Sequence, residues 1–243
     1  MAIRAASNFL DLAAPSKAEY VMCVSQRSAI NKINRNGVLL VFPINNRPEP
    51  HSLWTEMHPR LPMRWEWTDD GDDKVAAMWG LMKRLSDCRE VVYSKWYQGR
   101  ATFFSRSVFT AMLHLTWQVG DPLRGLSPTA EEILSALEGD SPLSTKELKK
   151  VTDLQGRLNE PQYSRAMKEL FSRLLVVAFG EVDDGAFPSL AVGATKTLYE
   201  DLWQAAKAMP TAEALAILNQ AMPAGSLVQR YFAKTLLRLK EQK

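Results

Sequence analysis

The sequence has few of the residues that form disulfides or bind metal ions: its 243 residues include two cysteines and three histidines. Cys23 and Cys88 lie far apart and form no C-x-x-C pair, so neither a disulfide framework nor a zinc site is expected. The spacing of His51 and His58 fits one helical face, but a proline soon breaks that helix. We interpret both as surface histidines and His114 as a histidine packed within a helix, and we expect no metal site.

Long apolar runs are missing as well. No window approaches the ~18 apolar residues that a membrane-spanning helix needs. Residues 1–15 contain Arg4 and a short apolar run, but no apolar core of the length that a secretory signal needs. The sequence therefore predicts a cytoplasmic protein without a membrane partner.

Signatures of nucleotide binding and of nucleophilic catalysis are also absent. There is no P-loop, no G-x-G-x-x-G and no G-x-S-x-G, so we expect no cofactor. The net charge is +3, from 30 Lys and Arg against 27 Asp and Glu. This excess is too small to identify a nucleic-acid partner unless the charge gathers on one face.

The N-terminal part of the chain combines helical and strand signals. Ser16 and Glu19 have the spacing of a capping box, which predicts a helix that continues to about Arg35. Gly37 is suited to end this helix, and the apolar run at 38–42 predicts a buried strand.

Further signals complete this first region. Ser52 opens a short helix, and residues 74–85 form another helical segment. Two β-rich runs within 90–104 are joined by Gln98-Gly99, which is typical of a hairpin. We assign residues 1–120 to an N-terminal mixed α/β region that resembles a degenerate winged helix.

Residues 125–192 show the clearest pattern. Ser127-Pro128 supplies an N-cap and a first helical residue, and Ser144 with Glu147 forms a capping box for a second helix. A third helix begins at Asn159 and carries one apolar stripe. The stripe consists of Tyr163, Ala166, Met167, Leu170, Phe171 and Leu174.

Two strands follow these three helices. A run at 175–179, a turn at Asp184-Gly185 and a return at 186–192 complete the order of a winged helix-turn-helix module. Residues 194–243 are expected to form C-terminal helices, one of them capped by Thr211. The predicted fold class is α+β, mostly helical, with winged helix-turn-helix modules and short β-hairpins.

The third helix of such a module enters the DNA major groove, and its first turns face the base edges. The face opposite the apolar stripe is polar, and residues 141–175 hold seven Lys or Arg against four Asp or Glu. Such an excess suits phosphate contacts. The candidate DNA-binding residues are Arg157, Gln162, Arg165 and Lys168, with Lys149 and Lys150 on phosphates.

The same pattern has two other interpretations. A solvated helix face commonly carries Lys and Arg whether or not it binds DNA. Winged helices also serve as protein-interaction modules. From these residues alone, DNA contact, a solvated face and a protein-docking face all remain open.

Aromatic and basic residues alternate between Trp54 and Trp117. Such rings can stack unpaired bases, but more often they form the core of a mixed α/β unit. We expect a core here, with Trp96 and Tyr97 as the exceptions, because they adjoin the turn at Gln98-Gly99.

An acidic run precedes the helix expected at 74–85. Its carboxylates can bind a hard cation, although carboxylates at a helix start are also favoured by the helix dipole. We adopt the second interpretation. The run consists of Asp69, Asp70, Asp72 and Asp73.

Several of these segments together resemble a known family. They are residues 36–43 (NGVLLVFP), 51–54 (HSLW), 93–96 (YSKW) and 100–103 (RATF), together with the module at 129–179. In this combination they are similar to the AlkZ (YcaQ) family of winged-helix DNA glycosylases, and most similar to its shorter AlkZ-related branch. The resemblance implies tandem winged helices around a DNA channel and, in the AlkZ type, removal of alkylated bases or unhooking of crosslinks.

The sequence departs from that family where the chemistry takes place. The resemblance implies a catalytic pair, Gln-hydrophobic-Gln or Gln-hydrophobic-Asp, that positions a water. Aligned from Gly37, the pair falls on Leu40 and Phe42, which can neither hold a water nor accept a proton. The family also has a histidine in a later Tyr-Trp-His-Ala motif. That histidine is absent here, and Arg100-Ala101 lies near its place. We therefore assign no catalytic residue.

These features together predict a protein that binds double-stranded DNA without excising bases. Two alternatives stay open at this point. One is a protein-interaction scaffold. The other is a diverged DNA glycosylase, a hydrolase whose acid has moved to Glu56, Glu66 or Glu90.

Overall fold

The computed structural model describes residues 17–64, 73–182 and 189–241, with side chains from residue 25 in the first range and from residue 74 in the second. The acidic run, apart from the backbone of Asp73, and the turn at Asp184-Gly185 lie outside the described residues.

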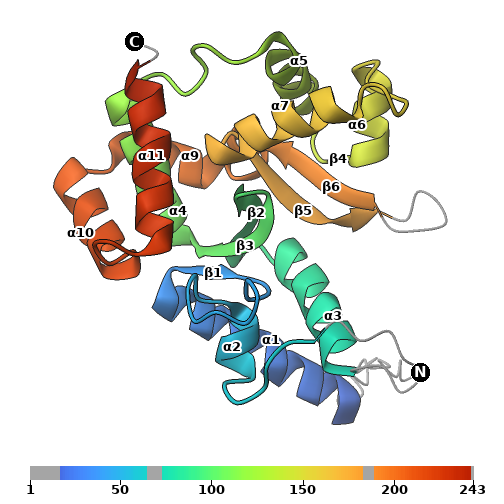
Figure 1. The fold of residues 1–243 in the computed structure, drawn as a ribbon, viewed down its shortest axis with the longest axis vertical. Coiled ribbons are helices and arrows are strands. Elements are labelled where there is room, and N and C mark those ends of the chain that lie inside the picture. Colours follow the sequence, from blue (N-terminus) through green and yellow to red (C-terminus); the bar gives the residue numbers. More distant parts are fainter. Residues whose placement is uncertain (1–16, 65–72, 183–188, 242–243) are drawn as a thin grey trace, which may run out of the picture.

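Two successive units of the chain have the same order of elements, helix–strand–helix–helix–strand–strand (Figure 1). The first consists of α1 (Lys17–Asn36), β1 (Val38–Leu40), α2 (Leu53–Met57), α3 (Asp73–Asp87), β2 (Val91–Tyr97) and β3 (Arg100–Ser105). The second consists of α5 (Pro128–Gly139), β4 (Leu143–Ser144), α6 (Thr145–Val151), α7 (Glu160–Ser172), β5 (Val176–Val182) and β6 (Ser189–Ala194).

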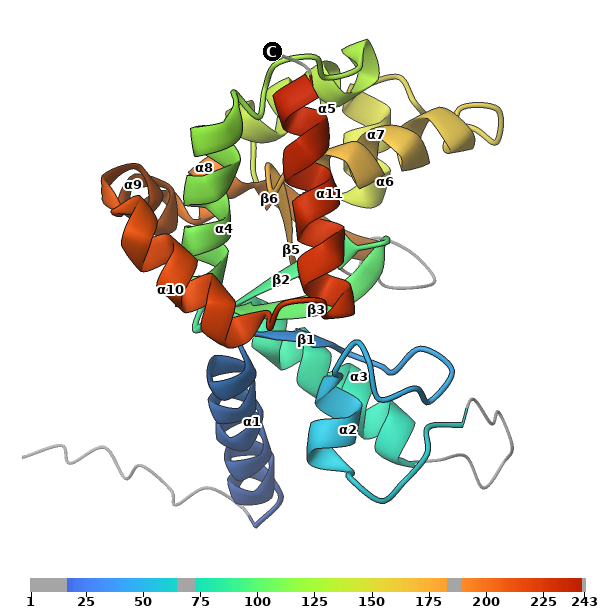
Figure 2. The ribbon, with the colours of Figure 1, turned by 60° about the vertical axis from the view of Figure 1, so that its left-hand side comes forward.

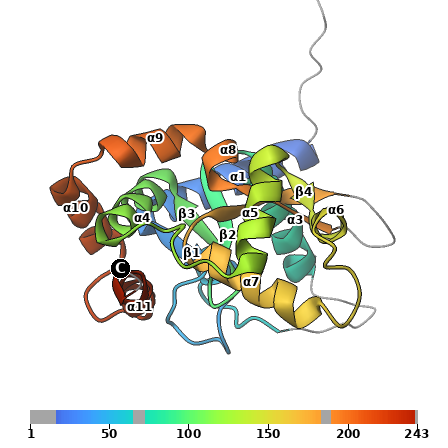
Figure 3. The same ribbon diagram turned by 90° about the horizontal axis from the view of Figure 1, so that it is seen from above.

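The remaining helices connect and extend these units. They are α4 (Arg106–Val119), α8 (Thr195–Leu198), α9 (Glu200–Ala208), α10 (Thr211–Ala221) and α11 (Leu227–Glu241). Seen from above, α4, α9, α10 and α11 gather on one side of the molecule and α5, α6 and α7 on the other (Figure 3). The prediction of a mostly helical α+β, winged-helix-like fold is confirmed.

The two units share one six-stranded antiparallel sheet, in the order β1-β3-β2-β5-β6-β4. The central pairing joins β2 with β5, which are the first strands of the hairpins in the two units, and places Tyr93 opposite Ala178. Packing across the junction is reciprocal, because α7 packs against β2 and α3 packs against β5. The position of α7 is therefore fixed partly by the N-terminal unit.

From Val91 to Tyr93 the side chains of β2 alternate between two apolar clusters, as the period of a strand requires. Tyr93 joins a cluster with Ile33 of α1 and Met82 of α3. Trp96 joins a larger cluster that includes Leu170 of α7 and Phe232 of α11. The second cluster thus connects the sheet to the helices on both sides of the molecule.

Local capping and turn predictions are largely confirmed. Ser144 and Glu147 form the predicted capping box at the start of α6, with N···O distances of 3.1 and 3.0 Å. Gln98 and Gly99 both have positive φ, 54° and 77°, in the tight turn between β2 and β3. This is the backbone of a type I′ hairpin.

Other local predictions hold only in part. The buried strand is present, but β1 ends at Leu40, short of the predicted run at 38–42. The third helix begins as predicted with Asn159 at its N-cap, but the Asn159 side chain makes no cap hydrogen bond, and its amide donates to the carbonyl of Gln155 at 2.9 Å. Pro210 occupies the N-cap of α10, and Thr211 is the first residue inside the helix. The sequence pattern predicted a helix around His114 but gave no bounds for α4.

The three histidines differ in their surroundings. His114 is buried within α4, and it lies 2.9 Å through Nδ1 from the carbonyl oxygen of Ala206 and 2.9 Å through Nε2 from the hydroxyl of Thr211. Since a carbonyl only accepts, Nδ1 carries the proton. His51 is exposed, whereas the ring of His58 lies 4.8 Å from that of Trp54. The described part of the chain has no helix that is both long and apolar enough to span a membrane.

Candidate nucleic-acid interface

α7 occupies the position of the recognition helix in the second unit. Its predicted apolar stripe is buried against α5 and β2, while Gln162, Arg165 and Lys168 are exposed. The N-terminal end of α7 projects away from α11, as Figure 2 shows. The first turns of the helix therefore lie on the outside of the molecule, with their polar side chains in solvent.

The opposite end of α7 is anchored by Arg173, whose side chain is 6% exposed. Its guanidinium donates to the carbonyl oxygens of Pro122 (2.9 Å), Arg124 (2.7 Å) and Gly125 (3.1 Å), and to the carboxylate of Glu169 (2.7 Å). Burial lowers the pKa of Arg173, and the neighbouring charge of Glu169 opposes that shift.

The same carboxylate ties α7 to the start of α5. Glu169 also accepts a hydrogen bond from the hydroxyl of Ser127 at 2.8 Å. Ser127 precedes α5 as predicted, but its hydroxyl is used in this way and does not cap the helix. The charge of Glu169 is therefore paired with that of Arg173 within the protein.

Three of the six predicted DNA-binding residues have partners inside the protein. The ammonium of Lys149 lies 2.6 Å from the carboxylate of Glu160 and over the ring of Tyr163. The amide of Gln162 donates to the hydroxyl of Thr129 at 2.6 Å. Arg165 donates through Nε to a carbonyl of its own helix, which leaves the rest of its guanidinium exposed.

The other three are exposed at different places on the module. Lys150 lies at the end of α6, and Arg157 lies in the turn that leads to α7. Lys168 lies farther along α7, on the side that faces α11. The structure thus spreads the six residues over the outer end of the module and one side of α7.

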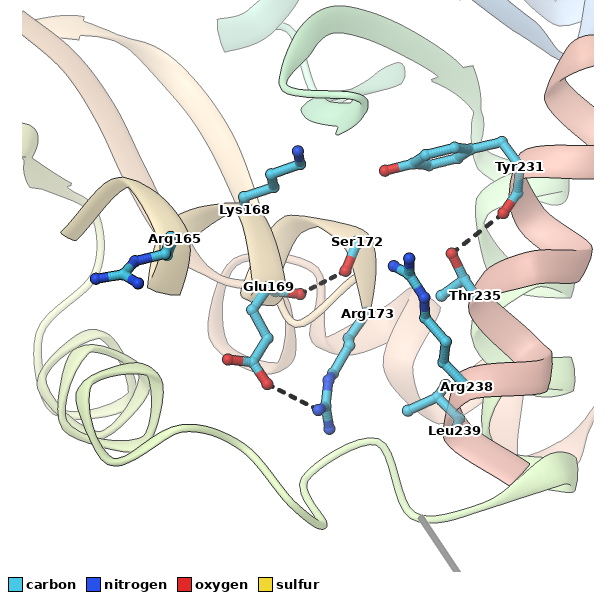
Figure 4. A pocket seen from close by; sticks show the side chains of 9 residues that line it. All are labelled: Arg165, Lys168, Glu169, Ser172, Arg173, Tyr231, Thr235, Arg238 and Leu239. Carbon is cyan, nitrogen blue, oxygen red and sulfur yellow. Dashed lines mark hydrogen bonds and ion pairs between the residues drawn. The ribbon is translucent and has the colours of Figure 1, made fainter. Parts of the chain in front are cut away.

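A groove separates α7 from α11. One part of it has a volume of about 310 Å³ and is lined by Lys168, Ser172 and Arg238, among others. A second part of about 360 Å³ extends toward Gln98 in the β2–β3 turn. Lys168, Tyr231, Thr235 and Arg238 line both parts, so they form one continuous α7/α11 groove (Figure 4).

The α7/α11 groove is strongly basic. Among the described residues that line it, six are Lys or Arg and one is acidic, Glu169. Since Glu169 is already paired with Arg173, its charge does not offset the remaining cations. The modest net charge of the chain is thus concentrated on one face, as an electrostatic footprint for a polyanion requires.

Half of these cations lie on α11 and were missed by the sequence analysis. Arg230, Lys234 and Arg238 are spaced at i, i+4 and i+8 and are exposed along one side of the helix. That spacing is visible in the sequence. Its significance depends on α11 lying beside α7, which the spacing does not show.

The expectation that Trp96 and Tyr97 are exposed is wrong. They are 1% and 4% exposed, and the ring of Tyr231 on α11 lies 4.9 Å from each of theirs. Neither ring can stack a base. Burial raises the pKa of the Tyr97 hydroxyl, while the nearby charges of Arg100 and Arg230 oppose the rise.

A comparison with known families decides the ancestry of this fold. The family model described as AlkZ related matches residues 24–228, which is most of the chain. The chain belongs to the AlkZ-related family. No curated protein and no solved structure matches it.

In this AlkZ-related protein Leu40 and Phe42, where the sequence resemblance led us to expect a catalytic pair, are apolar and packed. Leu40 is 1% exposed on β1, and its backbone N–H donates to the carbonyl of His51 at 2.9 Å. The ring of Phe42 lies 6.1 Å from that of Trp54 and 5.8 Å from that of Trp79.

Two of the three acids considered as alternatives form ion pairs. Glu56 lies 2.9 Å from Arg35 and 3.7 Å from Lys32, and Glu90 lies 3.1 Å from Arg27. Glu66 lies outside the described residues. Glu56 and Glu90 are therefore each engaged in an ion pair with a cation of α1.

Proposed function

We propose that this AlkZ-related protein binds double-stranded DNA through α7 and its preceding turn, and that it does not excise bases. The observation that carries the proposal is the free, polar N-terminal end of a recognition helix that projects from the molecule. A major groove admits one α-helix, and the first turns of that helix reach the base edges.

The exposed cations of the module are distributed as such a complex needs. Arg165 lies on the outer half of α7, where it can reach the major groove, whereas Arg157 and Lys150 flank its start. Cations that flank a recognition helix contact phosphates and fix its register on the duplex. Lys149 can contact a phosphate as well, but it must first break its ion pair with Glu160.

The environment of Leu40 and Phe42 supports the proposal that the protein does not excise bases. Both side chains lack a polar atom, and both are packed against neighbouring residues, so neither can position a water for attack on the sugar. We therefore propose that the scaffold of the glycosylases serves here for binding alone.

A protein-interaction scaffold is the second candidate, and one observation favours it. Val151 and Leu158, at the two ends of the turn between α6 and α7, are 60% and 96% exposed. Exposed apolar side chains at a projecting turn are suited to a protein partner. The salt dependence of DNA binding distinguishes the two candidates.

The first test measures affinity for a short fluorescent duplex at about 50 and 200 mM salt, where phosphate-dominated binding weakens steeply. Replacing Arg157 and Arg165 together by alanine is expected to weaken binding several-fold and to flatten the salt slope by about one unit, because Arg157 contacts a phosphate whereas Arg165 reaches the base edges. Arg60 and Lys207 are exposed outside the module, so the matched double alanine variant should bind as the parent does. No duplex binding at low salt would favour the scaffold.

The second test measures release of the modified base from an alkylated duplex. We expect no release above the rate without protein and no preference for the lesion in binding. Release that is lost on Glu56→Gln or Glu90→Gln, with folding unchanged, would instead identify a diverged glycosylase with a relocated acid.

A further inference from the structure

The α7/α11 groove extends the basic surface beyond the part of α7 that can enter a duplex. A helix with its side chains is about 10–12 Å across, and a major groove about 12 Å wide admits one such helix. Lys168 and Ser172 lie where α11 faces α7 across the groove (Figure 4). Because two helices cannot enter the same major groove side by side, this half of α7 is closed to a duplex.

The cations on α11 form a linear row. Arg230, Lys234 and Arg238 follow one another every four residues, so they are about 6 Å apart along the helix axis. This separation is comparable to that of successive phosphates along an extended nucleic-acid strand. All three are exposed and line the groove, and Lys168 faces them from α7.

An aromatic ring lies within this row of cations. Tyr231 is half-buried on α11, and Trp96 and Tyr97 support its ring from the sheet side. Its hydroxyl points across the groove toward Lys168 (Figure 4). A basic groove that tracks a backbone, combined with an aromatic ring that contacts bases, is the pattern of single-strand binding.

We propose that the α7/α11 groove binds an unpaired DNA strand that continues from the duplex held by the outer half of α7. The inference rests on the proposed function, and it names the form of DNA that the protein prefers: a junction between duplex and single strand. Phosphates of the unpaired strand contact the row on α11 and Lys168, while one base lies against Tyr231.

The test compares two fluorescent DNAs with equal numbers of phosphates, a blunt duplex and a shorter duplex with an overhang of about six nucleotides, within the span of known single-strand sites. Equal phosphate numbers keep the total charge of the two DNAs the same, and fewer counterions are released per phosphate from the single strand, so charge alone does not favour the overhang DNA. We expect the overhang DNA to bind roughly fivefold tighter or more, which is the gain in affinity typical of one stacked base.

Two variants separate the contributions within the groove. Tyr231→Leu removes the ring, and the double variant Arg230→Ala with Lys234→Ala removes two cations of the row. Each should abolish most of the preference for the overhang while leaving affinity for the blunt duplex within twofold. Lys240→Ala is the matched control, because Lys240 is exposed on the same helix and is not among the residues that line the groove.

The outcomes separate this inference from the proposed function. Tight binding of the blunt duplex with no gain from the overhang would overturn the inference and leave duplex binding standing. Weak binding of both DNAs would overturn the proposed function. The inference would also be overturned if both groove variants kept the preference for the overhang. It would be overturned as well if an acidic peptide of equal charge displaced the overhang DNA.

Discussion

Replacing Arg173 by methionine is expected to lower the free energy of unfolding by about 3–5 kcal/mol, the loss typical of breaking a buried ion pair. Methionine retains much of the aliphatic volume but has no donor. The carbonyls of Pro122, Arg124 and Gly125 would each lose their bond to the guanidinium, and Glu169 would lose its charged partner. The buried carbonyl of Pro122 and the unpaired Glu169 carboxylate account for much of the cost.

The measurement is a urea or thermal unfolding curve of the parent and the variant, and Arg165→Met provides the matched control. Arg165 lies on the same helix and is exposed, so its substitution by the same residue should change stability by no more than about 0.5 kcal/mol. If Arg173→Met unfolded at the same midpoint as this control, the segment at 120–126 would not depend on the guanidinium for its attachment to α7.

The role of Arg173 illustrates what the sequence can and cannot predict. The composition of residues 141–175 counts Arg173 as one positive charge among seven. Its burial depends on three carbonyls about fifty residues earlier in the chain, and no local pattern indicates that they converge. The capping box of Ser144 with Glu147 and the hairpin turn were predictable because their determinants lie within four residues of one another.

The candidate site shows the same division. The apolar stripe of α7 follows from helical periodicity alone, so its exposed face was also predictable. The groove was not, because it requires α11 to lie beside α7 although more than fifty residues separate them in the chain. The error for Trp96 and Tyr97 has this origin as well, since Tyr231 of α11 covers both rings.

The shared sheet was likewise hidden in the sequence. Each unit has its own hairpin signals, which predict separate modules. The pairing of Tyr93 with Ala178 joins strands that belong to different units. Strand pairing over such a separation depends on complementary packing of α3 and α7, and period-2 patterns contain no information about it.

A second substitution, Gly37→Ala, is expected to destabilise the protein by about 2–5 kcal/mol through backbone strain and overpacking together. Gly37 has φ of +77°, where L-residues are strained. A Cβ added there would lie 2.5 Å from the Cβ of Ala221 and 2.9 Å from Cγ2 of Val108. Gly37 is therefore the point where the end of α1 contacts both α4 and α10.

Gly99→Ala separates the two causes. Gly99 has the same φ of +77° in the β2–β3 turn, but an added Cβ there would have no neighbour within 4 Å. Its substitution should cost only the strain, about 1–2 kcal/mol. The difference between the two unfolding free energies measures how tightly α10 is packed against the N-terminal unit. If both variants lost the same stability, α10 would have moved to make room for the added methyl group. The C-terminal helices, α11 included, would then be able to shift their position beside the α7/α11 groove.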